Sequence, residues 1–305
     1  MKKNILFIIL FSLLTTISFA QDATTTPAVK EKDYPVNGAF ESGYLIDAQT
    51  TIVPSKKTLE FVIQHKFGTI DNGSTDIWGL YKSANVRLGL NYVPCKNVQI
   101  GAGLNKSFMT TDLNLKWTIL EQTRKNTMPV SVALFGNVAI DGRPLANFSN
   151  DSVREAYSGP VSEIKFSDRL SYFSQVIVGR KLNDKLSLQA GVSFSHYNMV
   201  EPGYDHDKVG VHFNGRLKVS NQGSIIFNYD QPLKIKNISE QLDWTTASEP
   251  NIAFGYEVST GTHAFQIFMS TSGSLLPQEG MMYNTRSFDK KGLSFGFLIT
   301  RLWGF

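Results

Sequence analysis

Apolar and polar residues alternate along most of the chain, in stretches of about ten residues separated by turn residues. In Lys185–His196, for example, every second residue from Leu186 to Phe194 is apolar, and the residues between them are polar or glycine. A period of two places successive side chains on opposite faces of a strand. The pattern predicts about twelve strands, each with one apolar and one polar face: Thr58–Phe67, Ala84–Val93, Asn97–Ser107, Thr111–Leu120, Pro129–Ile140, Leu170–Leu182, Lys185–Tyr197, Lys208–Val219, Gly223–Asp230, Asn251–Ser259, Thr262–Thr271 and Gly292–Trp303.

The length and spacing of these strands favour a membrane barrel. Strands of about ten residues match a tilted strand that crosses a bilayer, whereas soluble strands average about 5–6 residues. Tight turns at Asn183–Asp184 and Thr260–Gly261 contrast with long loops at Asp141–Arg169 and Gln231–Pro250, an asymmetry typical of outer-membrane barrels. The predicted fold class is all-β, a transmembrane antiparallel up-and-down β-barrel of about 12 strands with both termini periplasmic. A secreted soluble β protein is the alternative.

The N-terminus has the parts of a secretory signal peptide. A positive pair, Lys2 and Lys3, precedes the apolar stretch Ile5–Leu14, which is shorter than the roughly 20 residues of a spanning helix. We therefore expect cleavage rather than an uncleaved anchor. The expected organisation is a signal peptide at residues 1–20, a periplasmic leader or plug at residues 21–57, and the outer-membrane barrel at residues 58–305. Within the leader, Tyr44–Val53 is more apolar than its surroundings and is able to pack against another part of the protein.

Composition agrees with a barrel and excludes other classes of protein. Charged residues make up only 18% of the chain and aromatic residues 12%, whereas soluble domains carry about 25% charged residues. Without Lys2 and Lys3 the chain has 28 basic and 26 acidic residues, a formal charge of +2. This is too near neutral for an electrostatic nucleic-acid binder. The single cysteine, Cys95, excludes an internal disulfide framework.

The polar faces of the strands are expected to line the barrel lumen. The charged or titratable candidates on these faces are Glu60, Lys66, Arg87, Lys116, His212, Arg216, Lys218, Asp230 and Glu257. One interpretation is that this wall binds or selects a small polar or anionic solute. The other is that opposite charges pair across a narrow lumen and fill it, as side chains do in small barrels. The sequence leaves both interpretations open.

Other groups are weaker candidates for chemistry. The run Asp205-His206-Asp207 contains metal-ligand residue types, but three adjacent residues cannot all converge on one ion unaided. We expect a solvated loop there and no metal site. Ser195 and His196 are neighbours on a strand and point to opposite faces, so they cannot form a nucleophile–base pair. The sequence therefore favours a protein that is not an enzyme and uses no cofactor.

The C-terminal strand carries a signal of its own. Phe295, Phe297, Ile299 and Trp303 share one face, and the sequence ends at Phe305. This terminal aromatic residue resembles the recognition signal of the outer-membrane barrel assembly machinery. That machinery would then be a partner, together with outer-membrane lipid. The alternative is an aromatic side chain that only faces lipid.

Three sequence elements resemble a known family. Leu45–Thr50 (LIDAQT), His65–Gly68 (HKFG) and Trp78–Leu80 (WGL) are similar to the opening motifs of an uncharacterised family of Gram-negative outer-membrane β-barrel proteins, a domain of unknown function. The resemblance runs from Leu45 to the C-terminus. Lys66 stands where the family usually has arginine, and Tyr81 where it often has aspartate. The resemblance implies a barrel in the outer membrane of a Gram-negative bacterium and no established activity.

Two functions remain in view at this point. We expect an outer-membrane β-barrel that serves as a small-solute channel or ligand-binding pore. The alternative is a closed barrel that acts as a structural or partner-docking component of the outer membrane, with residues 21–57 in contact with a periplasmic partner.

Overall fold

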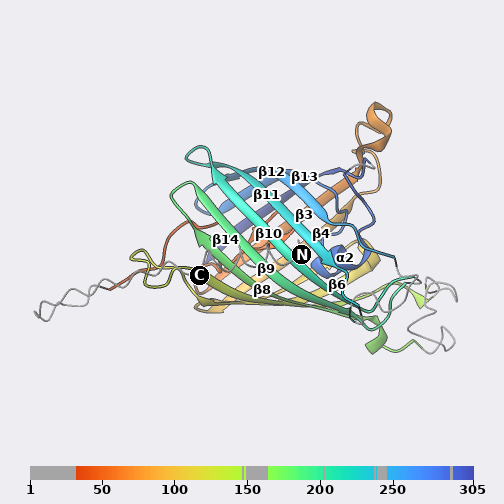
Figure 1. The fold of residues 1–305 in the computed structure, drawn as a ribbon, viewed down its shortest axis with the longest axis horizontal. Coiled ribbons are helices and arrows are strands. Elements are labelled where there is room, and N and C mark those ends of the chain that lie inside the picture. Colours follow the sequence, from red (N-terminus) through yellow and green to blue (C-terminus); the bar gives the residue numbers. More distant parts are fainter. Residues whose placement is uncertain are drawn as a thin grey trace, which may run out of the picture. The chain divides into compact units, whose positions relative to one another are not determined.

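Twelve antiparallel strands close into one barrel in the computed structural model (Figure 1). The structure describes residues 32–145, 148, 164–201, 203–236, 238, 246–288 and 291–305, so the expected signal peptide lies outside the described residues. The barrel strands are β3 (Thr58–Thr69), β4 (Asn85–Cys95), β5 (Val98–Asn105), β6 (Thr110–Leu120), β7 (Ser131–Ile140), β8 (Leu170–Lys181), β9 (Leu186–Tyr197), β10 (Asp207–Lys218), β11 (Gly223–Leu233), β12 (Asn251–Ser259), β13 (His263–Ser270) and β14 (Ser294–Gly304). Each lies on a predicted strand, and the predicted all-β fold, an antiparallel barrel of about 12 strands, is confirmed.

The alternation of residue types decides which side chains face the lumen. In β4, Leu88 and Leu90 are exposed on the outer surface, whereas Arg87 and Asn91 are buried. Each strand pairs with its neighbours in sequence, and β14 pairs with β3 to close the seam. The barrel therefore presents apolar side chains outward and polar side chains inward, as lipid on the outside requires.

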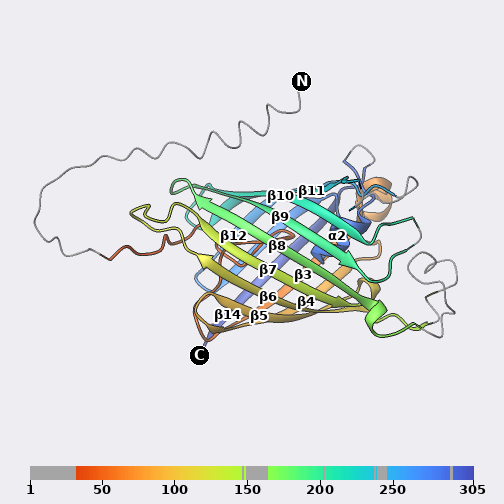
Figure 2. The ribbon, with the colours of Figure 1, turned by 60° about the horizontal axis from the view of Figure 1, so that its bottom comes forward.

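The two ends of the barrel differ. The C-terminus lies at the end with the tight turns (Figure 2). At this end the amide of Phe305 donates to the carbonyl of Lys57 at 3.1 Å, and the amide of Arg124 donates to the carbonyl of Tyr34 at 2.9 Å. The opposite end carries the long loops, with the short helices η1 (Ile70–Asp76), η2 (Ser107–Met109), η5 (Ser167–Arg169) and α2 (Pro277–Tyr283). In the described part of the chain, no helix is long and apolar enough to cross a membrane.

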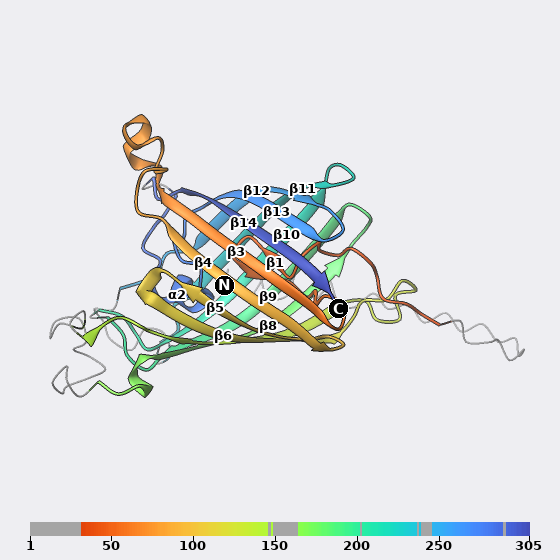
Figure 3. The same cartoon turned by 180° about the vertical axis from the view of Figure 1, so that it is seen from behind.

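A stretch of chain before the first barrel strand packs inside the barrel. Within it, β1 (Tyr44–Leu45) pairs with β2 (Ala48–Gln49) in a two-stranded sheet (Figure 3). Between them, Ile46 has a φ of 56°, a left-handed conformation that is rare for a β-branched residue. Its side chain is fully buried in an apolar cluster, which holds it there. We refer to Ala39–Ile52 as the inner segment.

Candidate functional site

The structure places almost all of the proposed lumen residues on the inner wall. Lys218, at the end of β10, is only partly buried. The others are at most 7% exposed: Glu60, Lys66, Arg87, Lys116, His212, Arg216, Asp230 and Glu257.

Ion pairs between neighbouring strands neutralise much of this wall. Arg87 donates from Nε and Nη2 to the two carboxylate oxygens of Asp112, at 2.8 and 2.7 Å. Arg216 donates from Nε to Glu257 at 2.9 Å. Sequence reasoning missed Asp112, although it is two residues before Asn114 on the same strand face, and the period of two was sufficient to find it. The proposed lumen residues contain more basic than acidic side chains, and the addition of Asp112 reduces that excess.

A chain of hydrogen bonds crosses β9, β10 and β11. His212 Nδ1 lies 2.7 Å from Asp230 Oδ1, and His212 Nε2 lies 2.7 Å from Ser193 Oγ. This order of groups matches that of a hydrolytic triad. The cavity beside His212 has a volume of only about 30 Å³, enough for about two water molecules. An ester or amide substrate does not fit there, so in this conformation the three groups satisfy one another's hydrogen bonds.

Apolar side chains of the inner segment anchor it to the wall. Phe40, Tyr44, Leu45 and Ile46 are each at most 3% exposed. They belong to one cluster with inward-facing residues of five barrel strands, namely Val62, Ile226, Ala253, Phe268 and Leu298. Burial of a large apolar side chain stabilises by about 1.5–3 kcal/mol, so these four contribute at most roughly 6–12 kcal/mol. The inner segment is thus a fixed part of the lumen.

Polar contacts also tie the inner segment to the wall. Lys66 Nζ donates to Asp47 Oδ2 at 2.6 Å and to the carbonyls of Ser272 and Ser274 at 2.7 and 2.9 Å. Lys116 Nζ donates to the carbonyl of Gly43 at 3.0 Å. Further hydrogen bonds come from β6, β9, β10 and β13, through Thr118, Gln189, Arg216 and Gln266. The segment therefore reaches from one side of the wall to the other and occludes the lumen.

Helix α2 occupies the lumen nearer the long loops. Met281 packs in one cluster with Phe135 and Phe173, and Gln278 donates to Asn137 Oδ1 at 2.7 Å. The space that remains between α2 and the inner segment is the cavity of about 30 Å³ beside His212. Two segments that are not barrel strands thus close the lumen.

Glu279 is the buried carboxylate of α2. It accepts hydrogen bonds from Ser107 Oγ at 2.5 Å and Asn105 Nδ2 at 3.4 Å. Burial raises the pKa of Glu279 to about 7. The hydrogen bonds from Ser107 and Asn105 and the charges of Lys66 and Arg143 offset this effect only in part. Glu279 therefore changes charge near neutral pH.

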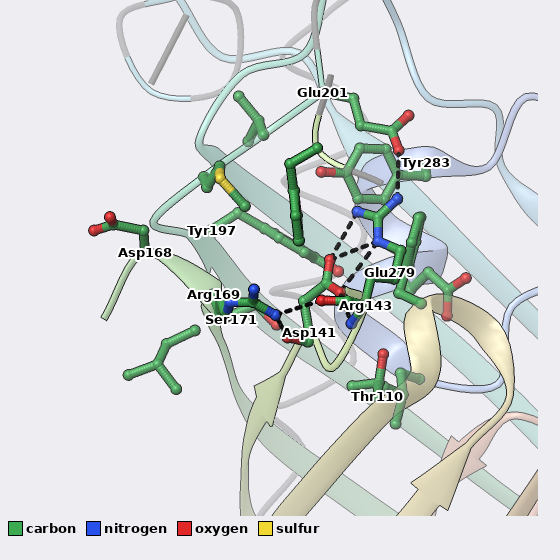
Figure 4. Close-up of a pocket in the computed structure, with 16 residues that line it drawn as sticks. Thr110, Asp141, Arg143, Asp168, Arg169, Ser171, Tyr197, Glu201, Glu279 and Tyr283 are labelled. Atoms are coloured by element: carbon green, nitrogen blue, oxygen red, sulfur yellow. Dashed lines mark hydrogen bonds and ion pairs between the residues drawn. The ribbon is translucent and has the colours of Figure 1, made fainter. Parts of the chain in front are cut away.

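Two arginines fasten the loop that follows β7 (Figure 4). Arg143 pairs with Asp141 at 2.7 Å, lies 3.7 Å from Glu201, and stacks with its Cζ 4.2 Å from the centre of the Phe108 ring. Arg169 donates to the backbone carbonyls of Asp141 and Arg143 at 3.1 and 2.6 Å. The cavity among them measures only about 40 Å³. The guanidinium groups of Arg143 and Arg169 thus stabilise the start of the loop that follows β7.

A larger recess opens at the same end of the barrel. Its volume is about 420 Å³, and its polar lining includes Asn85, Lys106, Ser107, Glu279 and Arg286. Glu279 lines both this recess and the smaller cavity of Figure 4. Sequence reasoning did not select these residues because they lie at the start of β4 and on two separate connections, and only the closed barrel brings them together.

The run Asp205-His206-Asp207 differs from the solvated loop that we expected. Asp205 is only 4% exposed. Asp207 begins β10 and accepts from His196 at 2.7 Å, while His206 Nδ1 lies 2.6 Å from the carbonyl of Tyr197. The expectation was wrong because pairing of β10 with β9 extends to Asp207 and draws the run into the barrel rim. Within the described residues, no group of three or more His, Cys, Asp or Glu side chains is placed to hold a metal ion.

Comparison with known proteins assigns the family. Residues 40–303 match the family described as "Membrane bound beta barrel domain (DUF5777)". The chain belongs to this family. The match covers the sequence elements LIDAQT, HKFG and WGL, and it confirms the resemblance to an outer-membrane barrel family that rests on them.

Several solved structures are similar to this chain at low identity. The NanC porin is 8% identical, with 80% of this chain and 99% of that chain covered and a TM-score of 0.46. The KdgM porin is 6% identical, with 81% and 99% covered and a TM-score of 0.43. The toluene transporter TodX of P. putida is 8% identical, with 84% and 91% covered and a TM-score of 0.40. No curated protein matches the sequence.

Proposed function

We propose that this protein is an outer-membrane channel for small polar solutes that is closed in the observed state. The observation that carries the proposal is the origin of the closure. The wall is polar, and the lumen is occluded by the inner segment and by α2 rather than by the barrel strands themselves. Moving those two segments would leave a hydrophilic passage through a barrel of twelve strands.

The proposed orientation has both termini in the periplasm. The tight turns, Phe305 and Tyr34 share one end of the barrel, and short turns are periplasmic in outer-membrane barrels. The side chain of Phe305 is 80% exposed, which makes it accessible to the barrel assembly machinery. Cleavage after residue 20 and a Gram-negative host belong to the same proposal.

A second candidate is a permanently closed barrel that serves as a structural or partner-docking component. The apolar anchoring of the inner segment favours it. If release of the inner segment costs about 6 kcal/mol, the lower end of the apolar burial energy given above, only about one molecule in 10⁴ has the segment released. In this case residues 21–38, which precede the inner segment, would contact a periplasmic partner. We propose no catalytic role in either case, since the cavity beside His212 is too small for a substrate.

Conductance across planar bilayers separates the two candidates. The full chain is expected to conduct poorly, whereas deletion of Gln21–Val53 together with Gln278→Ala and Glu279→Ala, which release α2, is expected to give stable conductance. Deletion of Gln21–Asp33 alone is the matched control, because it leaves the inner segment in place and should stay closed. Folding of each variant is checked by heat-modifiable migration on a gel. A folded double-release variant that does not conduct would refute the channel and leave the closed barrel.

A further inference from the structure

The recess at the long-loop end contains an arginine whose hydrogen bonding is incomplete. Nη1 of Arg286 is buried and has no hydrogen-bond partner among the described residues. A buried donor without an acceptor destabilises the protein, and more so when the donor is charged. Arg143 and Arg169, at the same end of the barrel, do have acceptors for their guanidinium groups. Arg286 thus differs from them in having a guanidinium donor that no acceptor of the described residues satisfies, although the residue lines the recess.

We infer that this recess binds a small organic anion with a carboxylate or phosphate group and that Arg286 is the residue that recognises it. The inference rests on the proposed function, because it names the class of solute that the outer mouth accepts. The planar guanidinium donates in a fork that matches a carboxylate or a phosphate. At about 420 Å³ the recess is within the range of small-molecule sites.

The guanidinium of Arg286 packs against Gly273. A Cβ atom at Gly273 would lie 2.7 Å from Nη1, 2.8 Å from Cζ and 2.9 Å from Nη2 of Arg286. The guanidinium therefore lies against the backbone of Gly273, and a side chain at position 273 would displace it. Asn85 Nδ2 holds this backbone in turn by donating to the carbonyl of Gly273 at 3.1 Å. This packing restricts the guanidinium on one side before a ligand binds, which reduces the freedom that it loses on binding.

The charge of the recess favours an anion. Lys106 supplies a second cation at the rim, where its Nζ donates to the carbonyl of Ala84 at 2.9 Å and forms no ion pair with any described carboxylate. The one acidic side chain of the lining, Glu279, is hydrogen bonded to Ser107 and is neutral below about pH 7. The recess thus carries two positive charges in mildly acidic solution and a smaller net positive charge in alkaline solution.

Isothermal titration calorimetry on the full chain, folded in detergent, tests the inference. Citrate and inorganic phosphate are the anionic probes, and glucose is the uncharged control. We expect at least one anion to bind, with affinity at least tenfold lower in Arg286→Gln and intermediate in Arg286→Lys, which keeps the charge but loses the fork. Arg124→Gln makes the same change at the tight-turn end and should leave binding unaltered. Gly273→Ala keeps the charge but displaces the guanidinium, so it should also weaken binding.

The outcomes are distinct from those of the conductance experiment. The inference is overturned if neither anion binds the folded wild-type chain, or if Arg286→Gln binds as tightly as wild type. Binding that is lost in Arg286→Gln supports the recess even if the double-release variant does not conduct. Conductance without anion binding supports the channel and removes the proposed solute class. If Arg286→Gln does not fold, Gly273→Ala provides the same comparison with the arginine retained.

Discussion

Lys66 connects three parts of the closed lumen, and its replacement is expected to loosen them together. Its ammonium group joins β3 to Asp47 of the inner segment and to the chain that leads into α2. Lys66→Met removes the cation and leaves Asp47 with two weaker contacts, from Asn251 Nδ2 at 3.2 Å and Ser270 Oγ at 3.4 Å. Loss of one partner from a buried ion pair costs about 3–5 kcal/mol. We expect the docked inner segment to be destabilised by that amount.

A second substitution separates the ion pair from simple loss of packing. Replacing both partners, in Lys66→Met with Asp47→Leu, leaves no buried charge, and such apolar replacements are often nearly neutral. The double variant still leaves the carbonyls of Ser272 and Ser274 without the lysine, at about 1–3 kcal/mol. The double variant is therefore expected to be more stable than Lys66→Met but less stable than the wild type.

Hydrogen exchange of the inner segment, followed by mass spectrometry on the folded barrel, measures these differences. A loss of 3–5 kcal/mol corresponds to exchange that is about 10² to 10⁴ times faster across residues 39–52. Lys218→Met is the matched control, since Lys218 is partly exposed at the end of β10. The reasoning is refuted if exchange in Lys66→Met rises less than tenfold, or if the double variant exchanges as fast as the single one.

Two further predictions concern groups inside the barrel. The pKa of Glu279 is about 7 when α2 is docked and about 4.5 in water, so the docked state retains its proton to higher pH. The free energy that holds α2 in place should therefore fall by up to roughly 3 kcal/mol as pH rises from about 4.5 to 7, and should not change further above pH 7. Hydrogen exchange of α2 at pH 5 and pH 8, corrected for intrinsic rates, should show this difference in the wild type, and a difference that persists in Glu279→Gln would contradict it. A fluorophosphonate probe should leave Ser193 unmodified, because Ser193 is only 3% exposed and the cavity beside its partner His212 measures only about 30 Å³. Mass spectrometry would detect an adduct on Ser193. An adduct that forms in the wild type but not in His212→Gln would contradict the prediction, because it would show that the serine is reactive.

The strands were predictable because their pattern is local. A strand between lipid and a polar lumen alternates along its whole length, so a period of two was enough to locate all twelve. Their ends depend on neighbours. The predicted end of β11 at Asp230 was three residues short of the observed end at Leu233. Pairing with β12 ends at Asp230, and only β10 continues alongside Pro232. Proline is tolerated at such an edge.

The contents of the lumen were much less predictable. The apolar stretch around Leu45 and Ile46 was visible in the sequence, but not the wall against which it packs. The ion pair of Lys66 with Asp47 requires the leader to lie inside the barrel. Arg286 stands in a long loop with no local pattern, and its significance comes from Gly273 and the recess around it. These contacts join distant segments, and sequence periodicity carries no information about them.

The position of the apolar cluster bears on how the barrel assembles. The inner segment touches Val62 on β3 and Leu298 on β14, the first and last strands of the barrel. These strands meet only when nearly the whole chain has been brought together, and joining the ends of so long a loop is entropically costly. The inner segment directly precedes β3 and offers β14 an apolar surface beside its partner. The segment that closes the lumen is thus also a template for the seam, and a chain without it would have to find that last pairing unaided.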